Sequence, residues 1–175
     1  AAHQRFVQER QILAGLRHPN IARLLDGGVV DGRPYLVLER VEGEAITEYC
    51  RSHAVRPEER IRLLLQACDA VAHAHSHGIV HRDLKPSNLL VERGPDGSAR
   101  VAVLDFGIAR IEHADLHVTS TGEIFGTPGY MSPEQALGDR EAVDRRTDVY
   151  SLGVLLYELL SGARPYEGET TPQIL

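Results

Sequence analysis

The chain has 175 residues, of which 42% are apolar and 25% charged, and this composition is typical of a globular domain with a sizeable core. The net charge of −6 and an isoelectric point near 5.8 argue against a nucleic-acid-binding protein, which needs a basic surface. No apolar run approaches the ~20 residues that cross a bilayer, so the sequence predicts no membrane contact by this segment.

The N-terminal residues predict a helix over about residues 4–17. Phe6, Leu13 and Leu16 share one face of such a helix. His18-Pro19 ends it, because the residue before a proline avoids helical backbone angles.

Two short strands are predicted next, at residues 21–25 and 35–39. Asp31-Gly32 between them is typical of a tight turn, so we expect an antiparallel hairpin. Residues 41–43 are expected to form a linker.

The clearest helix is predicted over residues 57–77. Pro57 suits its first turn, where a missing N–H costs nothing, and Gly78 suits a left-handed cap. Its apolar residues form one stripe at helical spacing: Ile61, Leu64, Leu65, Cys68, Val71 and Ala72.

A second hairpin is expected from strands at residues 89–91 and 101–104, around the turn at residues 94–97. Residues 105–134 show little periodicity. A helix follows over residues 147–160; it is apolar almost all round, which predicts burial on all sides, and Gly162 ends it.

Two strings carry the chemistry: HRDLKPSN, which begins at His81, and DFG, which begins at Asp105. Both resemble motifs of protein kinases, and the resemblance implies phosphoryl transfer. Phosphoryl transfer needs positioning and neutralised charge rather than covalent help from the protein. Asp83 can orient a substrate hydroxyl and accept its proton, and Lys85 can reach the transferred phosphate. Asn88 and Asp105 offer the hard oxygen ligands that Mg²⁺ prefers.

These strings resemble the catalytic loop and the metal-binding motif of the protein kinase superfamily, in particular bacterial-type serine/threonine kinases. The resemblance implies an α+β, two-lobed fold. We expect a partial small lobe at residues 1–40, with the regulatory helix and a hairpin, and a partial, mainly helical large lobe at residues 41–175. It also implies ATP and Mg²⁺ as cofactors, and serine or threonine hydroxyls of proteins as acceptors.

The resemblance also implies a nucleotide site. Glu9 takes the place of the glutamate that pairs with the ATP-binding lysine; without that lysine it is an ordinary helix carboxylate. Leu38 resembles the gatekeeper, the backbone of Glu39 and Val41 would contact the adenine edge, and Leu90 would lie under the ring.

Two further sets follow from the resemblance. Leu13, Leu24, His81 and Phe106 match the stack of side chains that couples the two lobes in active kinases. Asp148 resembles the buried aspartate that hydrogen-bonds the catalytic-loop backbone.

Substrate class and regulation follow in the same way. Lys85, and Thr127 in Gly-Thr-Pro, resemble the serine/threonine branch rather than tyrosine kinases. Arg82 precedes the catalytic aspartate, and kinases with this arginine usually need a phosphate on the activation segment. The expected phosphorylation sites are Thr119, Ser120 and Thr121; a merely polar loop is the alternative.

The histidines of the 57–77 helix leave an alternative open. His73 and His77 have the i, i+4 spacing of zinc ligands. Histidines are also common in kinase sequences before the catalytic loop, and His75 is expected to be a packed core histidine.

The glycine-rich loop and the ATP-binding lysine of a working kinase do not occur in this sequence, whose single Lys is Lys85, and the chain begins at Ala1 rather than Met. We therefore expect a segment of a longer cytoplasmic kinase that is inactive alone. Its parent could be membrane-anchored elsewhere and could dimerise for trans-autophosphorylation. The alternatives are a truncated or pseudokinase scaffold and a small-molecule kinase.

Overall fold

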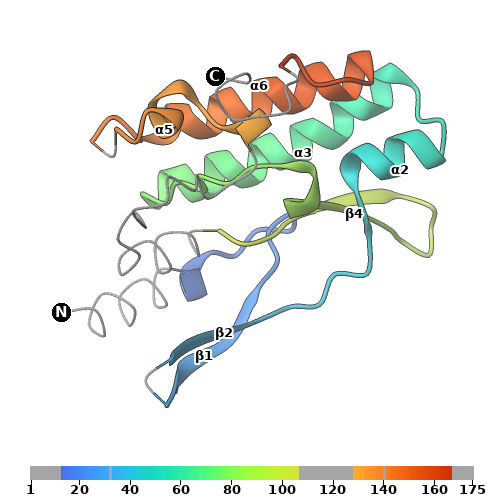
Figure 1. Ribbon diagram of the computed structural model, residues 1–175. Coiled ribbons are helices and arrows are strands. Elements are labelled where there is room, and N and C mark those ends of the chain that lie inside the picture. Colours follow the sequence, from blue (N-terminus) through green and yellow to red (C-terminus); the bar gives the residue numbers. More distant parts are fainter. Residues whose placement is uncertain (1–12, 32, 107–127, 140, 167–175) are drawn as a thin grey trace.

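The computed structural model describes residues 13–31, 33–106, 128–139 and 141–166 (Figure 1). The described part of the first predicted helix is helical over residues 13–15, so the helix ends two residues earlier than expected. Among the predicted site residues, five lie outside the described ranges: Glu9, Thr119, Ser120, Thr121 and Thr127.

The first hairpin pairs β1 (Leu24–Val30) with β2 (Arg33–Leu38) in antiparallel register, and Val30 lies opposite Arg33. Asp31 has a φ of 52°, which agrees with the predicted tight turn. In Figure 1 this hairpin projects away from the helices.

The predicted bounds of the first strand are wrong. The strand begins at Leu24 and continues through Gly28 to Val30. Gly28 lies opposite Tyr35, and a Cβ at Gly28 would lie only 2.9 Å from the Tyr35 hydroxyl oxygen. The Tyr35 ring thus leaves no room for a side chain at this position, and this explains why a glycine lies inside the strand. Ile21 instead forms an isolated parallel bridge with Val103.

Residues 39–43 have no regular structure, as the linker prediction required. They lead to a three-stranded antiparallel sheet in the order β3 (Glu44–Ala45), β4 (Leu89–Arg93) and β5 (Ala99–Val103). The second predicted hairpin is thus confirmed, although β4 extends two residues further and β5 ends one residue earlier. The short helix α2 (Ile46–Ser52) follows β3.

The helix α3 (Pro57–Ser76) confirms the clearest prediction, and Gly78 after it has a φ of 74°. The predicted apolar stripe is only partly right, because Ile61 and Leu65 are 40% and 54% exposed. The buried face is rotated: Leu63, Leu64, Ala67, Ala70, Val71 and Ala74. The helix α3 is covered on two sides, by the sheet at β5 and by the helix α6, and its alanines allow both to pack closely.

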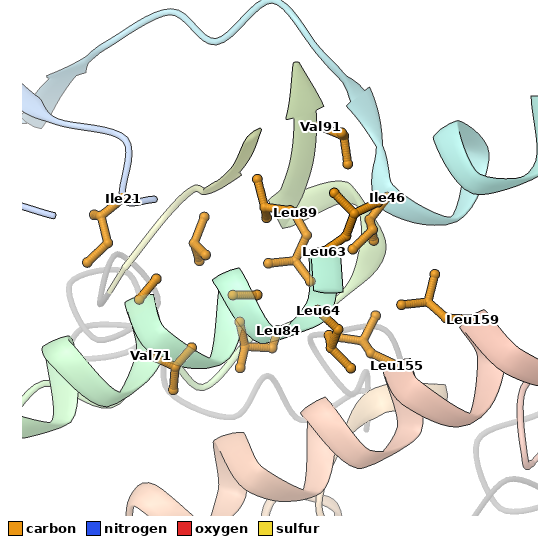
Figure 2. Packing of buried hydrophobic residues seen from close by; sticks show 14 of the residues in the cluster. Ile21, Ile46, Leu63, Leu64, Val71, Leu84, Leu89, Val91, Leu155 and Leu159 are labelled. Carbon is orange, nitrogen blue, oxygen red and sulfur yellow. The ribbon is translucent and has the colours of Figure 1, made fainter. Parts of the chain in front are cut away.

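The core lies on both sides of α3. Figure 2 shows Leu63 of α3 near Ile46 and Leu89, and Leu64 facing Leu155 of α6. Leu63, Ile46, Leu89 and Leu155 each have 0% exposure, so each contributes about 1.5–3 kcal/mol of burial free energy.

The last elements are the 3₁₀ turn η2 (Pro128–Tyr130), α5 (Pro133–Ala136) and α6 (Arg145–Ser161). The prediction that the last helix is buried on all sides is wrong: Val149 is 62% and Tyr157 52% exposed. One face of α6 packs along α3, as Figure 1 shows, while these side chains lie on its outer face. None of the helices in the described ranges has the length and apolar character that a membrane span needs.

The end of α6 gives a first test of local stability. Gly162 has a φ of 81° and caps the helix, and a Cβ there would meet no atom within 4 Å. We expect Gly162→Ala to lower the free energy of unfolding by about 1 kcal/mol, because only backbone strain is added. The matched control is Gly153→Ala inside α6, which also meets no atom and should raise it by about 0.5–1 kcal/mol. Urea unfolding, with the α6 amides followed by hydrogen exchange, measures both; equal effects of the two changes would contradict this account of the cap.

Candidate active site

The loop that follows α3 is held by one buried carboxylate. Asp148, in the first turn of α6, has 0% exposure. It accepts hydrogen bonds from the backbone N–H groups of His81 and Arg82, both at 2.8 Å. Arg82 has a φ of 70°, a left-handed conformation that costs free energy in a residue with a side chain. The two hydrogen bonds thus hold the strained start of the loop, in the way that the resemblance implied for Asp148.

His75 is a partner that the sequence analysis missed. It was expected to pack in the core, and its side chain is 14% exposed, but its Nε2 atom lies 2.7 Å from Oδ2 of Asp148. The contact joins α3 to α6 across 73 positions of sequence. No local pattern predicts such a pair, because it depends on how the two helices pack.

His81 connects the loop to the residues before Asp105. It has 0% exposure; its Nε2 atom lies 2.8 Å from the carbonyl oxygen of Leu104, and its Nδ1 accepts from the N–H of Asp83 at 3.3 Å. These partners require a neutral ring that carries its proton on Nε2. The ring of Phe106 meets His81 edge-on, with 4.8 Å between ring centroids.

The functional side chains of the loop converge on Asp83. The Lys85 ammonium lies 2.7 Å from Oδ2 of Asp83. Asn88, in the short turn η1 (Pro86–Asn88), donates through Nδ2 to the carbonyl oxygen of Asp83 at 2.8 Å and to Oδ2 at 3.3 Å. The Asp83 side chain is 37% exposed, so a substrate hydroxyl can reach it. Because Asn88 donates through its nitrogen, its amide oxygen remains the atom suited to a metal ion.

Asp105 follows β5 and is exposed, with a φ of 58°. Its position is set by the N–H of Leu104, which donates to the carbonyl oxygen of Asn88 at 2.9 Å. That bond ties the end of the second hairpin to η1, so the two predicted oxygen ligands, Asn88 and Asp105, belong to adjoining segments. A carboxylate and an amide oxygen are the donors that suit Mg²⁺.

The stack implied by the resemblance is brought together. Leu13, Leu24 and Phe106 line one small cavity, and Phe106 contacts His81. Leu38, the expected gatekeeper, lines the same cavity, as does Asp105.

The nucleotide contacts are placed as follows. Glu39 directly follows β2, and its N–H donates to the carbonyl oxygen of Arg23 at 2.8 Å. Val41 lies in the extended segment that leads to β3. Leu90 is half-buried in β4, opposite Ala45 and Ala102. No contact given by the structure assigns these residues to adenine, so that role stays a prediction.

The segment after η2 supports the loop from the other side. The Gln135 amide donates to the carbonyl oxygen of Arg82 at 2.6 Å, and Gln135 also forms a capping box with Ser132. The sequence Ser-Pro-Glu-Gln carries the signature of that box and would have predicted α5. Glu134 accepts from the Thr147 hydroxyl at 2.6 Å, which lowers the pKa of the Glu134 carboxyl.

His81 gives the site a pH dependence. Burial lowers the pKa of His81 below its usual value, and this outweighs the opposing effects of the Asp148 charge, the hydrogen bond with the Leu104 carbonyl, and the charges of Asp83 and Asp105. The unfolded chain therefore takes up a proton at pH ~6.5, where folded His81 stays neutral. The stability contributed by neutral His81 is complete above this pH and is lost progressively as the pH falls from there to the lowered pKa of folded His81. We expect the His81 ring to titrate below a histidine peptide in an NMR titration; titration at or above the peptide value would contradict the buried neutral tautomer.

Comparison with known proteins agrees with this geometry. The family described as "Protein kinase domain" matches residues 1–175. The serine/threonine-protein kinase pkn2 of Myxococcus xanthus is 40% identical over 167 residues, 94% of this chain and 20% of that protein. PknB of Mycobacterium leprae is 40% identical over 95% of this chain and 26% of that protein. PrkC of Bacillus subtilis is 39% identical over 98% of this chain and 26% of that protein.

The chain thus spans about a fifth to a quarter of the length of these curated relatives. Among solved structures, a crystal structure of Rad53 in complex with AMP-PNP has a TM-score of 0.75 and 29% identity, and the match covers 97% of this chain and 41% of that one. The fold is that of a protein kinase, and the chain belongs to the protein kinase domain family.

Proposed function

We propose that this chain is the catalytic part of a serine/threonine protein kinase that uses ATP and Mg²⁺. The observation that carries the proposal is the grouping of Lys85 and Asn88 on Asp83, in a loop held by Asp148. The curated relatives bear the name serine/threonine-protein kinase, and the Rad53 neighbour was crystallised with AMP-PNP. The intact set of Asp83, Asn88 and Asp105 argues against a scaffold that has lost catalysis.

In this reaction Asp83 orients the serine or threonine hydroxyl and accepts its proton as the oxygen attacks the γ-phosphorus. The bond from that phosphorus to the bridging oxygen breaks, and ADP leaves. Lys85, beside Asp83, neutralises charge on the transferred group. Asn88 and Asp105 would hold Mg²⁺, which supplies positive charge at the phosphates.

The remaining assignments belong to the same proposal. The backbone of Glu39 and Val41 would contact adenine, with Leu90 beneath it, and Glu9 would pair with an ATP-binding lysine. The small lobe would end near residue 40, within the extended segment between β2 and β3. Thr119, Ser120 and Thr121 would receive activating phosphates, Arg82 would take part in recognising them, and Thr127 would lie in the substrate loop. Trans-autophosphorylation through dimers and a cytoplasmic location complete the proposal.

The natural full-length protein tests this proposal with labelled ATP, Mg²⁺ and a general protein acceptor. We expect label on serine and threonine after acid hydrolysis, and mass spectrometry should find phosphate within residues 119–121 of active protein. Label on tyrosine would contradict the substrate class. ATP binding without any transfer would favour the scaffold alternative.

A further inference from the structure

Three histidines meet where residues 16–20 pack against the last turns of α3. The ring of His73 lies between the other two, with its centroid 5.2 Å from that of His18 and 4.6 Å from that of His77. His73 and His77 belong to α3 or its cap, whereas His18 belongs to the loop. Among the described residues no group of three histidine, cysteine or acidic side chains is arranged to hold a metal ion.

The loop that carries His18 is docked onto α3 and β5 by its neighbour Asn20. The Asn20 amide donates to Oε1 of Gln66 at 3.0 Å and to the carbonyl oxygen of Val101 at 2.7 Å. The N–H of Val103 donates to the carbonyl oxygen of Asn20 at 2.8 Å, and the N–H of Ala22 to that of Val103 at 3.0 Å. The amides of Ala22 and Val103 therefore report whether the loop is docked.

The histidine contact suits neutral rings. Nδ1 of His18 accepts a hydrogen bond from the N–H of Asn20 at 3.1 Å, and a protonated ring cannot accept it. Nε2 of His73 is buried and has no hydrogen-bond partner in the described part of the chain. Protonation of His18 would therefore remove its hydrogen bond from Asn20 and place a positive charge against the His73 ring.

The surrounding charges do not reverse this preference. The pKa of His18 is lowered mainly by burial and further by the neighbouring His73. Asp69 of α3 acts in the opposite direction. The guanidinium of Arg100, in β5, donates to the carbonyl oxygen of Pro19, so a positive charge already lies beside this loop. The net direction is a lowered pKa for His18, so the contact is complete above pH ~6.5 and weakens as the pH falls below it.

We propose that the contact between His18 and His73 forms an acid-sensitive clasp, which holds residues 16–20 against α3 while His18 is neutral and releases them when His18 is protonated. Leu16, at the start of this loop, and Ile21, directly after it, line the cavity that Asp105 and Phe106 also line. Release would loosen the wall beside Asp105, so phosphoryl transfer would fall in mild acid. Only this last consequence rests on the proposed function.

Hydrogen exchange of the natural full-length protein tests the clasp without an activity assay. Protection factors of the Ala22 and Val103 amides, corrected for intrinsic exchange, are measured from about pH 7.5 to about pH 5.5. We expect the protection factors to decrease as the pH falls, by about tenfold per pH unit for each proton that the protein binds when the loop is released.

Variants separate the clasp from the other titrating groups. His18→Asn keeps a side-chain acceptor for the amide two residues on, and His73→Phe keeps a ring of similar size; neither titrates. We expect each to reduce the pH dependence of these two amides, and the double variant to leave only the part that other groups such as His81 contribute. The control His53→Phe removes a histidine that stacks on Tyr49 of α2 and should leave it unchanged. Protection that does not change with pH in the natural protein, or that changes equally in the double variant, would overturn the proposal.

Discussion

Replacing Asp83 by asparagine in the natural full-length protein is expected to lower kcat for phosphoryl transfer by about 10²–10⁴-fold. The substitution keeps the size of the side chain but removes the carboxylate that accepts the hydroxyl proton and that Lys85 contacts at 2.7 Å. The Kd for ATP should change little, because Asp83 is assigned to the acceptor hydroxyl rather than to the nucleotide. Steady-state assays and nucleotide titration measure the two effects separately.

A matched control makes this result specific. Asp144→Asn is the same chemical change at the N-cap of α6, where Asp144 accepts from the N–H of Arg146 at 2.8 Å. Asparagine caps helices as well as aspartate does, so kcat should be unchanged. If Asp83→Asn retained the natural kcat, or lost ATP binding in parallel with kcat, the role of Asp83 as proton acceptor would be rejected.

Replacing Asp148 by alanine is expected to lower the free energy of unfolding by about 3–5 kcal/mol. The change leaves the buried N–H groups of His81 and Arg82 without their acceptor and removes the partner of His75. Asp148→Asn should cost less, since one amide oxygen can still accept. Urea unfolding, with the α3 amides followed by hydrogen exchange, measures both.

The control lies four residues away on the same helix. Asp144→Ala removes an exposed N-cap and should cost only about 0.5–2 kcal/mol. A cost at Asp148 no larger than that at Asp144 would mean that the catalytic loop does not depend on the buried carboxylate. In that case the strain at Arg82 would have to be held by other contacts, such as the one from Gln135.

Local patterns were sufficient where neighbouring residues decide the structure. Pro57 marks the start of α3, Gly78 follows its end, and Gly162 ends α6, because caps depend on backbone angles within one turn. The strings around Asp83 and Asp105 were sufficient for the family, since their order and spacing are those of the catalytic chemistry.

The tertiary structure alone decided which faces are buried and which distant groups meet. The helical spacing of apolar residues placed Leu65 in the core, yet Leu65 is 54% exposed. The buried face of α3 is set by the two elements that cover it, β5 and α6, and a single apolar stripe does not define that face. His75 contacts Asp148, and His18 contacts His73, across long separations in sequence. The sequence by itself determined the helix ends and the chemistry of the loop at Asp83. The packing of α3 between sheet and helix determined how that loop is held, because hydrogen bonds between distant segments exist only after those segments have packed.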